Sequence, residues 1–329
     1  MPLSLYIDGK KWRGHLSGMV SAKPGLVPVI KGNGYGFGLE FLASEATRLG
    51  VETVAVGIAS EVAIVRNAFA GEIILLSPDH AIDDFSDSKV LQTISSLETL
   101  QKIDMKANVI LEILTPLNRH GVDISELERA IAIINNRGLQ MRGFALHLPI
   151  APIKSAWISS ILSLLPEGST VWISHLHSGD LTRKEFPKLH FRERVGTSLW
   201  LGADSALEVT ASVLENRKIS GTAGYQQVKV NGNVIVASGG TAHGIGLTAP
   251  QGTQSPLGRI KIIARAIELA FGKMRSPYRW DGKEMDFLEP PHMQCSLLTY
   301  SGAHQPKPGD ELKVRVRYTT TNFDQIIVR

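Results

Sequence analysis

The first two hundred residues alternate short β-rich apolar runs with helical patterns, and this alternation constrains the fold more than any other feature of the chain. The segments 39–49, 60–70, 125–136 and 155–165 carry apolar residues at i, i+3 and i+4. Because parallel strands need a crossover connection, strand–helix alternation predicts a parallel sheet. The candidate strands are 26–31, 53–57, 73–76, 90–94, 108–114, 143–147, 170–174 and 192–195.

Eight such units close a (β/α)8 barrel and fewer give an open doubly wound sheet, so the count alone leaves both architectures open. From about Lys218 the pattern changes to short strands separated by turns. Asn231-Gly232-Asn233 is a good hairpin signal between alternating apolar residues. The C-terminal third is therefore predicted to be a mostly antiparallel β domain. Its candidate strands are 228–230, 234–237, 297–300, 312–318 and 325–328.

Composition and charge narrow the function classes. The net charge of +4, from 35 basic and 31 acidic residues, is small and dispersed. The run Lys10–Arg13 is broken by Trp12 and is interpreted as a solvated edge, so no nucleic-acid surface is expected. No segment approaches the roughly 18 apolar residues of a membrane helix. A single cysteine, Cys295, excludes an intrachain disulfide, and the N-terminus lacks signal-peptide features, so a cytoplasmic location is expected.

The segment from Pro28 to Gly38 carries the strongest chemical signal. An apolar strand ends in Lys31, and four glycines follow at alternate positions. Partial burial lowers the pKa of a lysine, which makes its amine a usable nucleophile and base. The glycine spacing does not fit a dinucleotide loop, because the third glycine of that motif falls on Phe37 or Leu39. A strand-end Lys31 that merely reaches solvent is the competing interpretation.

This string resembles the lysine motif of alanine racemases, which bind pyridoxal 5′-phosphate (PLP). The matches are Lys31, Asn33, Tyr35, Gly36 and Gly38, and the resemblance continues in order along nearly the whole chain. It implies a (β/α)8 TIM-like barrel over residues 10–205 with PLP on Lys31. It also implies a second, mostly antiparallel β domain over 206–329, with Leu3–Asp8 as a candidate further strand of that domain. No metal site is expected.

The resemblance also places barrel residues around the cofactor. It implies that His147 packs on the cofactor ring, although a strand-end histidine taken alone is more often structural. It places Arg194 opposite the pyridine nitrogen, where a protonated guanidinium leaves that nitrogen bare. Such an arrangement disfavours decarboxylation and transamination and favours racemisation. The implied cofactor-binding residues are Lys31, Tyr35, His147, Ser178, Arg194, Gly196 and Thr197.

Two further segments are implied to bind the substrate. The segment from Glu112 to Gly121 resembles one in which a carbamylated lysine holds the arginine that contacts the substrate carboxylate. Arg119 matches that arginine, and Glu112 supplies an anion in place of the modified lysine. The alternative is an ordinary surface ion pair. Met293 matches a methionine whose backbone contacts the same carboxylate.

The resemblance implies a homodimer with shared active sites, in which Tyr225 reaches the partner's Lys31. Racemisation needs a base on each face of the α-carbon, and Lys31 and Tyr225 would supply them. A tyrosine has a reference pKa of about 10, so it needs a cationic neighbour, for which His175 and His177 are candidates. The alternative for Tyr225 is a packed aromatic of the β domain.

Three polar groups of the family are replaced, by Thr241, Gln294 and Phe323, so the identity of the amino acid stays open. The sequence predicts a PLP-dependent amino-acid racemase that forms a D-amino acid by two-base α-proton exchange. A racemase of another amino acid or amine metabolite is one alternative, and a PLP-binding protein without turnover is another. A barrel enzyme that uses no PLP requires every match to be accidental.

Overall fold

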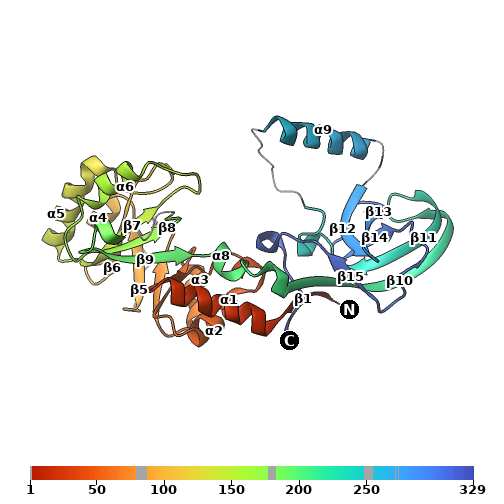
Figure 1. Cartoon of the computed structure of the whole chain (residues 1–329), viewed down its shortest axis with the longest axis horizontal. Coiled ribbons are helices and arrows are strands. Elements are labelled where there is room, and N and C mark those ends of the chain that lie inside the picture. The colour runs from red at the N-terminus through yellow and green to blue at the C-terminus, as the bar shows by residue number, and fades with distance from the viewer. Residues whose placement is uncertain (1, 79–86, 177–182, 248–254, 271, 273) are drawn as a thin grey trace. The chain divides into compact units, whose positions relative to one another are not determined.

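The computed structural model describes residues 2–78, 87–176, 183–247, 255–270, 272 and 274–329 (Figure 1). The chain divides into two compact units. One is Arg13–Gly202, and the other combines Met1–Trp12 with Ala203–Arg329.

The first unit is a barrel of eight parallel strands. β2 pairs with β9, and a bridge between Val29 and Ala55 joins the continuation of β2 to β3, so the sheet closes on itself. All eight predicted strands are confirmed, and the open sheet is excluded. In spatial order the strands are β2 (Val27–Pro28), β9 (His190–Val195), β8 (Thr170–Ser174), β7 (Gln140–His147), β6 (Asn108–Ile113), β5 (Val90–Ile94), β4 (Glu72–Leu75) and β3 (Thr53–Val56).

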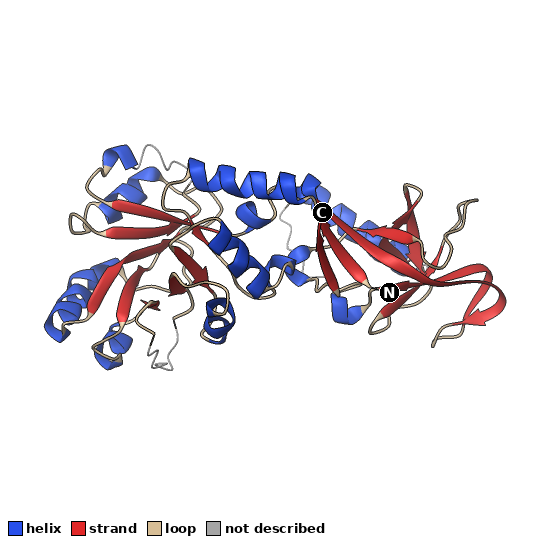
Figure 2. Ribbon diagram, turned by 90° about the horizontal axis from the view of Figure 1, so that it is seen from below, coloured by secondary structure: helices blue, strands red, loops and turns tan. Residues whose placement is uncertain are grey.

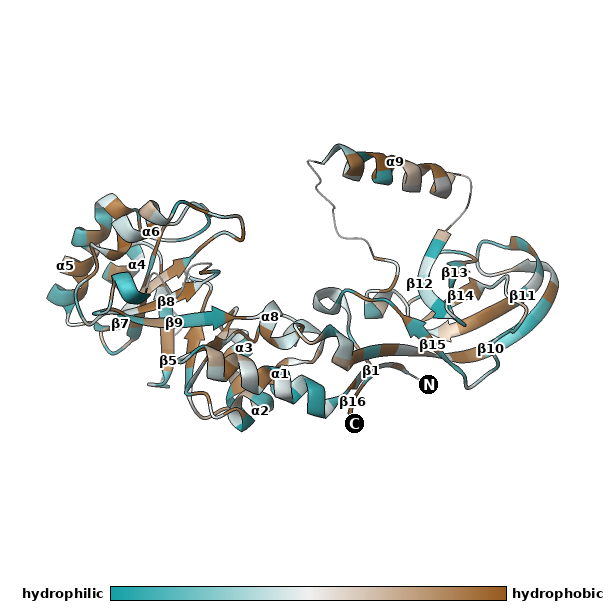
Figure 3. Ribbon diagram, in the orientation of Figure 1, coloured by the Kyte–Doolittle hydropathy of each residue, from teal (hydrophilic) through white to brown (hydrophobic). Residues whose placement is uncertain are grey.

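Two layers of apolar side chains hold the barrel together. One inward-facing layer fills its interior and includes Val29, Ile110 and Trp172, and the outer faces of the strands pack under the helices (Figure 2). The strands are therefore apolar on both faces, and β5 and β8 are coloured as largely hydrophobic (Figure 3). The helices described here are α1 (Gly9–Ala22), α2 (Leu39–Arg48), α3 (Ser60–Arg66), α4 (Leu97–Lys102), α5 (Leu127–Arg137), α6 (Ser155–Leu162) and α8 (Thr197–Trp200).

The run Lys10–Arg13 lies in α1, where Lys10 and Lys11 are exposed as expected of a solvated edge, whereas Trp12 is not. Trp12 and Leu16, four residues apart, are both completely buried. Positions i and i+4 share one helix face, so the two lysines before Trp12 lie exposed while the tryptophan packs inward.

The second unit is a ring of six antiparallel strands, extended by two more. In ring order these are β11 (Val228–Ser238), β14 (Cys295–Thr299), β13 (Lys283–Phe287), β12 (Met274–Trp280), β15 (Glu311–Val314) and β10 (Leu207–Ala223), and β10 pairs with β11 to close the ring. β1 (Leu3–Ile7) pairs antiparallel with β10 and parallel with β16 (Gln325–Val328). A helix, α9 (Pro256–Ala270), precedes β12.

The predicted hairpin at Asn231-Gly232-Asn233 was wrong. β11 runs straight through these residues, and Gly232 pairs with Ile219 of β10. Asn233 Nδ2 donates to Asn216 Oδ1 of β10 at 2.8 Å, so a cross-strand bond replaces the local turn bond. Ten paired positions along the ribbon outweigh one local preference, and the reversal falls at Gly224–Gln227 instead.

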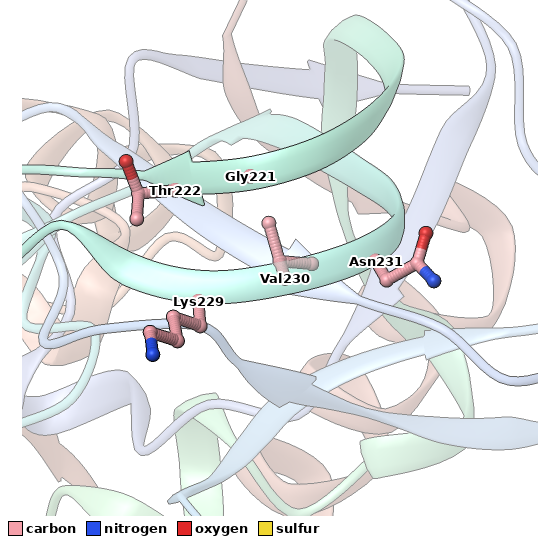
Figure 4. Close-up of a pocket in the computed structure, with 5 residues that line it drawn as sticks. All are labelled: Gly221, Thr222, Lys229, Val230 and Asn231. Carbon is pink, nitrogen blue, oxygen red and sulfur yellow. The ribbon is translucent and has the colours of Figure 1, made fainter.

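A hollow on the β10–β11 ribbon is lined by Gly221, Thr222, Lys229, Val230 and Asn231 (Figure 4). Lys229 is its only charged side chain. A lone cation without an acid–base partner supplies no evident chemistry, so no role is assigned to this hollow.

Candidate active site

Lys31 lies at the carboxyl end of the first barrel strand. The Ile30 amide still donates to Ala55 O at 2.7 Å, and Lys31 O then accepts from the Gly34 amide at 3.0 Å as the chain turns. Burial lowers the pKa of the Lys31 amine, and the positive charges of Arg119 and Arg194 lower it further, against the opposing charge of Glu61. The amine therefore gives up its proton more readily than a surface lysine does.

Glu61, in the first turn of α3, fixes the backbone around Lys31. Its carboxylate accepts from the Gly32 amide at 2.6 Å, the Gly57 amide at 2.6 Å and the Ile58 amide at 3.3 Å. The carboxylate thus joins the loops that follow β2 and β3. A Cβ at Gly57 would lie 3.1 Å from Lys31 Cβ, so the two strand ends are closely packed. This role was not predicted from the sequence, because Glu61 acts on backbone amides.

His147, at the end of β7, is held in its neutral form. Arg119 Nη2 donates to His147 Nδ1 at 2.7 Å, so this ring nitrogen is an acceptor. Burial, followed by the charges of Arg194 and Arg119, lowers the pKa of His147 to about 3. Thr115 Oγ1 donates to His147 O at 2.6 Å and ties the end of β6 to the end of β7.

Arg194, on β9, is a buried cation that points into the barrel. Its Nε donates to Ser174 Oγ at 3.1 Å and its Nη2 to Leu146 O at 3.2 Å. Burial lowers the pKa of Arg194 to about 10, with Glu112 opposing, so the guanidinium stays protonated at neutral pH.

Glu112, on β6, is the acidic residue whose charge raises the pKa of Arg194. Its side chain is 3% exposed, and Oε2 is buried without a hydrogen-bond partner among the described residues. Burial raises the pKa of Glu112, and the charges of Arg194 and then Arg119 oppose this. The hydrogen bond of Arg119 goes to His147. The predicted Glu112–Arg119 ion pair is absent among the described residues, and the two side chains interact only through their charges, together with Arg194.

Tyr35 and Gly196 approach each other at the barrel end. Tyr35 is buried, and burial, with a smaller effect of Glu61, raises the pKa of its phenol to about 12. A Cβ at Gly196 would overlap the Tyr35 hydroxyl, so only glycine fits. Gly196 lies between β9 and α8, and Thr197 begins α8. Ser178 and His177 lie outside the described residues.

The depressed pKa of His147 predicts a pH dependence of stability. Between 6.5 and about 3 the unfolded chain binds a proton at His147 that the folded chain does not, so stability falls as pH falls through this window. The slope from this group is at most about 1.4 kcal/mol per pH unit. Urea unfolding at about pH 7 and about pH 4.5 should show a smaller loss for His147→Gln than for the wild type. His190→Gln, at an exposed strand position, is the matched control and should behave like the wild type.

Tyr225 lies in the turn between β10 and β11, and its side chain is 85% exposed. The ring of His292 lies against it, with 4.4 Å between ring centroids. Of the two histidines suggested by the sequence, His175 instead stacks on His147 in the barrel unit at 5.7 Å. The contact with His292 was not predicted from the sequence.

Met293 follows His292 in a segment held by the loop at 240–242. Met293 O accepts from the Ala242 amide and His292 O from the Thr241 amide, each at 2.9 Å. The Met293 side chain is 72% exposed and Thr241 is exposed as well. Both residues are therefore open to a ligand or a second chain.

Two features are absent from the described residues. None of the helices there is both long and apolar enough to cross a membrane. No group of three or more His, Cys, Asp or Glu side chains in that part of the chain is placed to hold a metal ion.

Comparisons with known proteins agree with this geometry. Residues 13–160 match the family model "Alanine racemase, N-terminal domain". The N-terminal part of the chain is therefore similar to that of alanine racemases. The alanine racemase of Campylobacter concisus is 32% identical over 125 residues, which are 38% of this chain and 36% of that protein. The alanine racemase of Nitratiruptor is 30% identical over 132 residues, covering 39% of this chain and 38% of that protein. The sequence match thus spans less than two fifths of these relatives' length.

Solved alanine racemases share the fold of the whole chain. The structure from Bartonella henselae, which contains covalently bound pyridoxal phosphate, superposes with a TM-score of 0.75 and 17% identity over 100% of both chains. The enzyme from Clostridium difficile 630 gives a TM-score of 0.73 and 16% identity, covering 100% of this chain and 96% of the other. The alanine racemase fold therefore extends beyond the matched N-terminal segment to the β domain.

Proposed function

We propose that the protein is a PLP-dependent amino-acid racemase. The observation that carries the proposal is Lys31, a lysine with a lowered pKa that follows a barrel strand and lies near Arg119, Arg194 and His147. Three basic side chains and a neutral imidazole meet there, with Glu112 and Glu61 as the acids whose charge acts on them. Such a site suits a ligand that carries phosphate and carboxylate groups.

The residues around Lys31 fit PLP. Lys31 would bind the cofactor covalently, and the backbone amides of Gly196 and Thr197 would hold its phosphate beside the Tyr35 hydroxyl, where a Cβ at Gly196 would fill the space. His147, neutral and fixed by Arg119, would lie against the ring. Ser178 is proposed as a further phosphate ligand from its sequence position. When bound, PLP supplies an electron sink for the charge left by α-proton removal.

The other side chains of the site would bind the substrate, balance charge and transfer protons. Arg119 would bind the substrate carboxylate, and Glu112 would balance the positive charge of both arginines. Met293 is proposed to contribute its backbone at the same carboxylate. Arg194 stays protonated and therefore cannot accept a proton from a ligand. Lys31 Nζ would carry the proton on one face of the α-carbon.

Tyr225 is proposed to carry the proton on the other face. An 85% exposed tyrosine must be covered by another surface before its hydroxyl can act in a water-poor site. We propose that a homodimer supplies this surface, with each Tyr225 serving the partner's Lys31. The proposed substrate is a small amino acid, alanine included, and the product its D- or L-enantiomer. A cytoplasmic location accords with PLP use and the single cysteine.

The test is α-proton exchange in deuterated water with the PLP-loaded protein and a panel of L- and D-amino acids. The wild type should exchange both enantiomers of at least one amino acid. Tyr225→Phe should lower exchange from one enantiomer by roughly 10²–10⁴-fold and spare the other, because it removes a single proton carrier. Tyr300→Phe, a tyrosine elsewhere in the β domain, is the control. If PLP binds and no amino acid exchanges, the protein is a PLP-binding protein without turnover.

A further inference from the structure

A buried carboxylate organises the turn that carries Tyr225. Glu289 is 1% exposed. Its Oε1 accepts from the Tyr225 amide at 3.0 Å and its Oε2 from the Gln226 amide at 2.9 Å. Gly224 has φ of 77°, and a Cβ there would overlap the Glu289 carboxylate. The turn is therefore built around this carboxylate, and Gly224 leaves the room for it.

The same carboxylate also holds His292. His292 Nε2 lies 2.6 Å from Glu289 Oε1, and Nδ1 lies 3.9 Å from Cys295 Sγ. Burial raises the pKa of Glu289, but hydrogen bonds from the Gln226 amide, His292 and the Tyr225 amide outweigh it, so the net shift is downward. An ionised Glu289 only accepts, so Nε2 is the nitrogen that carries the proton.

The backbone of His292 is fixed as well. Its amide donates to Cys295 O and its carbonyl accepts from the Thr241 amide, each at 2.9 Å. The imidazole is therefore a rigid surface, and the Tyr225 ring lies on it at 4.4 Å and a tilt of 35°. Without such a surface an exposed tyrosine samples several rotamers, whereas a proton carrier must be held to within about 0.5 Å.

We propose that Glu289 and His292 are positioning residues that act as one unit and fix the Tyr225 hydroxyl for proton transfer. Glu289 sets the backbone of the turn and the imidazole, and the imidazole sets the phenol ring. Neither residue needs to touch the substrate. This inference rests on the proposed function, because it assigns the support of the proposed second proton carrier.

The test uses the PLP-loaded full chain with three variants: Glu289→Gln, His292→Ala and the two combined. Each should lower kcat for exchange on the Tyr225 face by about 10- to 100-fold with little change in KM, since a misplaced carrier affects the chemical step. Exchange on the Lys31 face should stay within about twofold of the wild type. Because the two residues form one unit, the double variant should be no slower than the slower single variant. Glu284→Gln, an exposed acid of β13 in the same domain, should leave both faces unchanged.

A second readout needs no turnover. Ring stacking shifts the NMR signals of the His292 imidazole, and Tyr225→Leu should remove that shift. Glu289→Gln should move the same signals towards the values in Tyr225→Leu, since the ring loses its anchor. His292→Gln, which keeps a donor but has no ring, should not restore exchange on the Tyr225 face.

The two hypotheses fail in different ways. A wild type that binds PLP and exchanges neither enantiomer defeats the proposed function, and the NMR comparison then decides whether the three residues form a unit. A wild type that exchanges on both faces, with the Glu289 and His292 variants equal to Glu284→Gln or slowed equally on both faces, overturns the inference alone.

Discussion

Lys31→Ala should abolish covalent PLP uptake and reduce α-proton exchange by at least roughly 10²–10⁴-fold, the largest loss expected of any single substitution. The amine is both the attachment point and a proton carrier, so one change removes two functions. Purified wild type should absorb near the visible edge of the ultraviolet, and borohydride should fix the cofactor on the peptide that contains Lys31.

Two further variants separate attachment from charge. Lys31→Arg keeps a cation but has no nucleophilic amine, so it should also fail to retain the cofactor after borohydride treatment and dialysis. Lys102→Ala removes an exposed lysine of α4 and should keep the wild-type spectrum and rate. Label recovered on any peptide without Lys31 would refute the assignment of this lysine.

Glu61→Ala should lower the free energy of unfolding by about 2–4 kcal/mol, because it leaves the amides of Gly32, Gly57 and Ile58 without their acceptor. A urea titration should show a lower midpoint with an unchanged slope. PLP uptake by the folded variant should also weaken, because the backbone beside Lys31 loses its anchor.

The control for this prediction is Glu40→Ala. Glu40 also lies in the first turn of a barrel helix, α2, but it is exposed. Its replacement should change the unfolding free energy by less than about 0.5 kcal/mol. Equal effects of the two substitutions would show that the Glu61 hydrogen bonds contribute nothing specific.

The barrel could be predicted from the sequence because its strands are apolar on both faces. A run such as Thr53–Val56, buried at every position, stands out against the amphipathic helices around it. Lys31, Arg119, His147 and Arg194 were predicted from the sequence as site residues, since each lies at or near a strand end within a motif, and the structure places them close enough for their charges to act on one another. Helix α1 was missed because two lysines precede the buried Trp12 and conceal its apolar face.

The β domain was harder to predict because its pairings join residues distant in sequence. The residues adjacent to Asn231-Gly232-Asn233 do not indicate that this segment lies inside a strand, which pairs with β10 at ten positions. Glu61, Glu289 and His292 were missed for a related reason: they act through backbone amides and ring packing, which leave no motif. Glu289 and His292 flank Pro290-Pro291 in the sequence. Their shared role is evident only in the folded chain, where Glu289 binds both the Tyr225 amide and His292.

The pairing of β1 between β10 and β16 has a consequence for how the molecule is assembled during synthesis. Ser4 pairs with both Thr210 and Gln325, so the barrel is an insertion between β1 and the rest of its own sheet. As the chain emerges, Arg13–Gly202 can fold while residues 3–7 remain unpaired. Their partner strands, β10 and β16, are synthesised about two hundred and about three hundred residues later. Closing loops of that length is slow compared with local barrel contacts. The β domain is therefore expected to fold last, and residues 3–7 form an exposed apolar strand edge until it does.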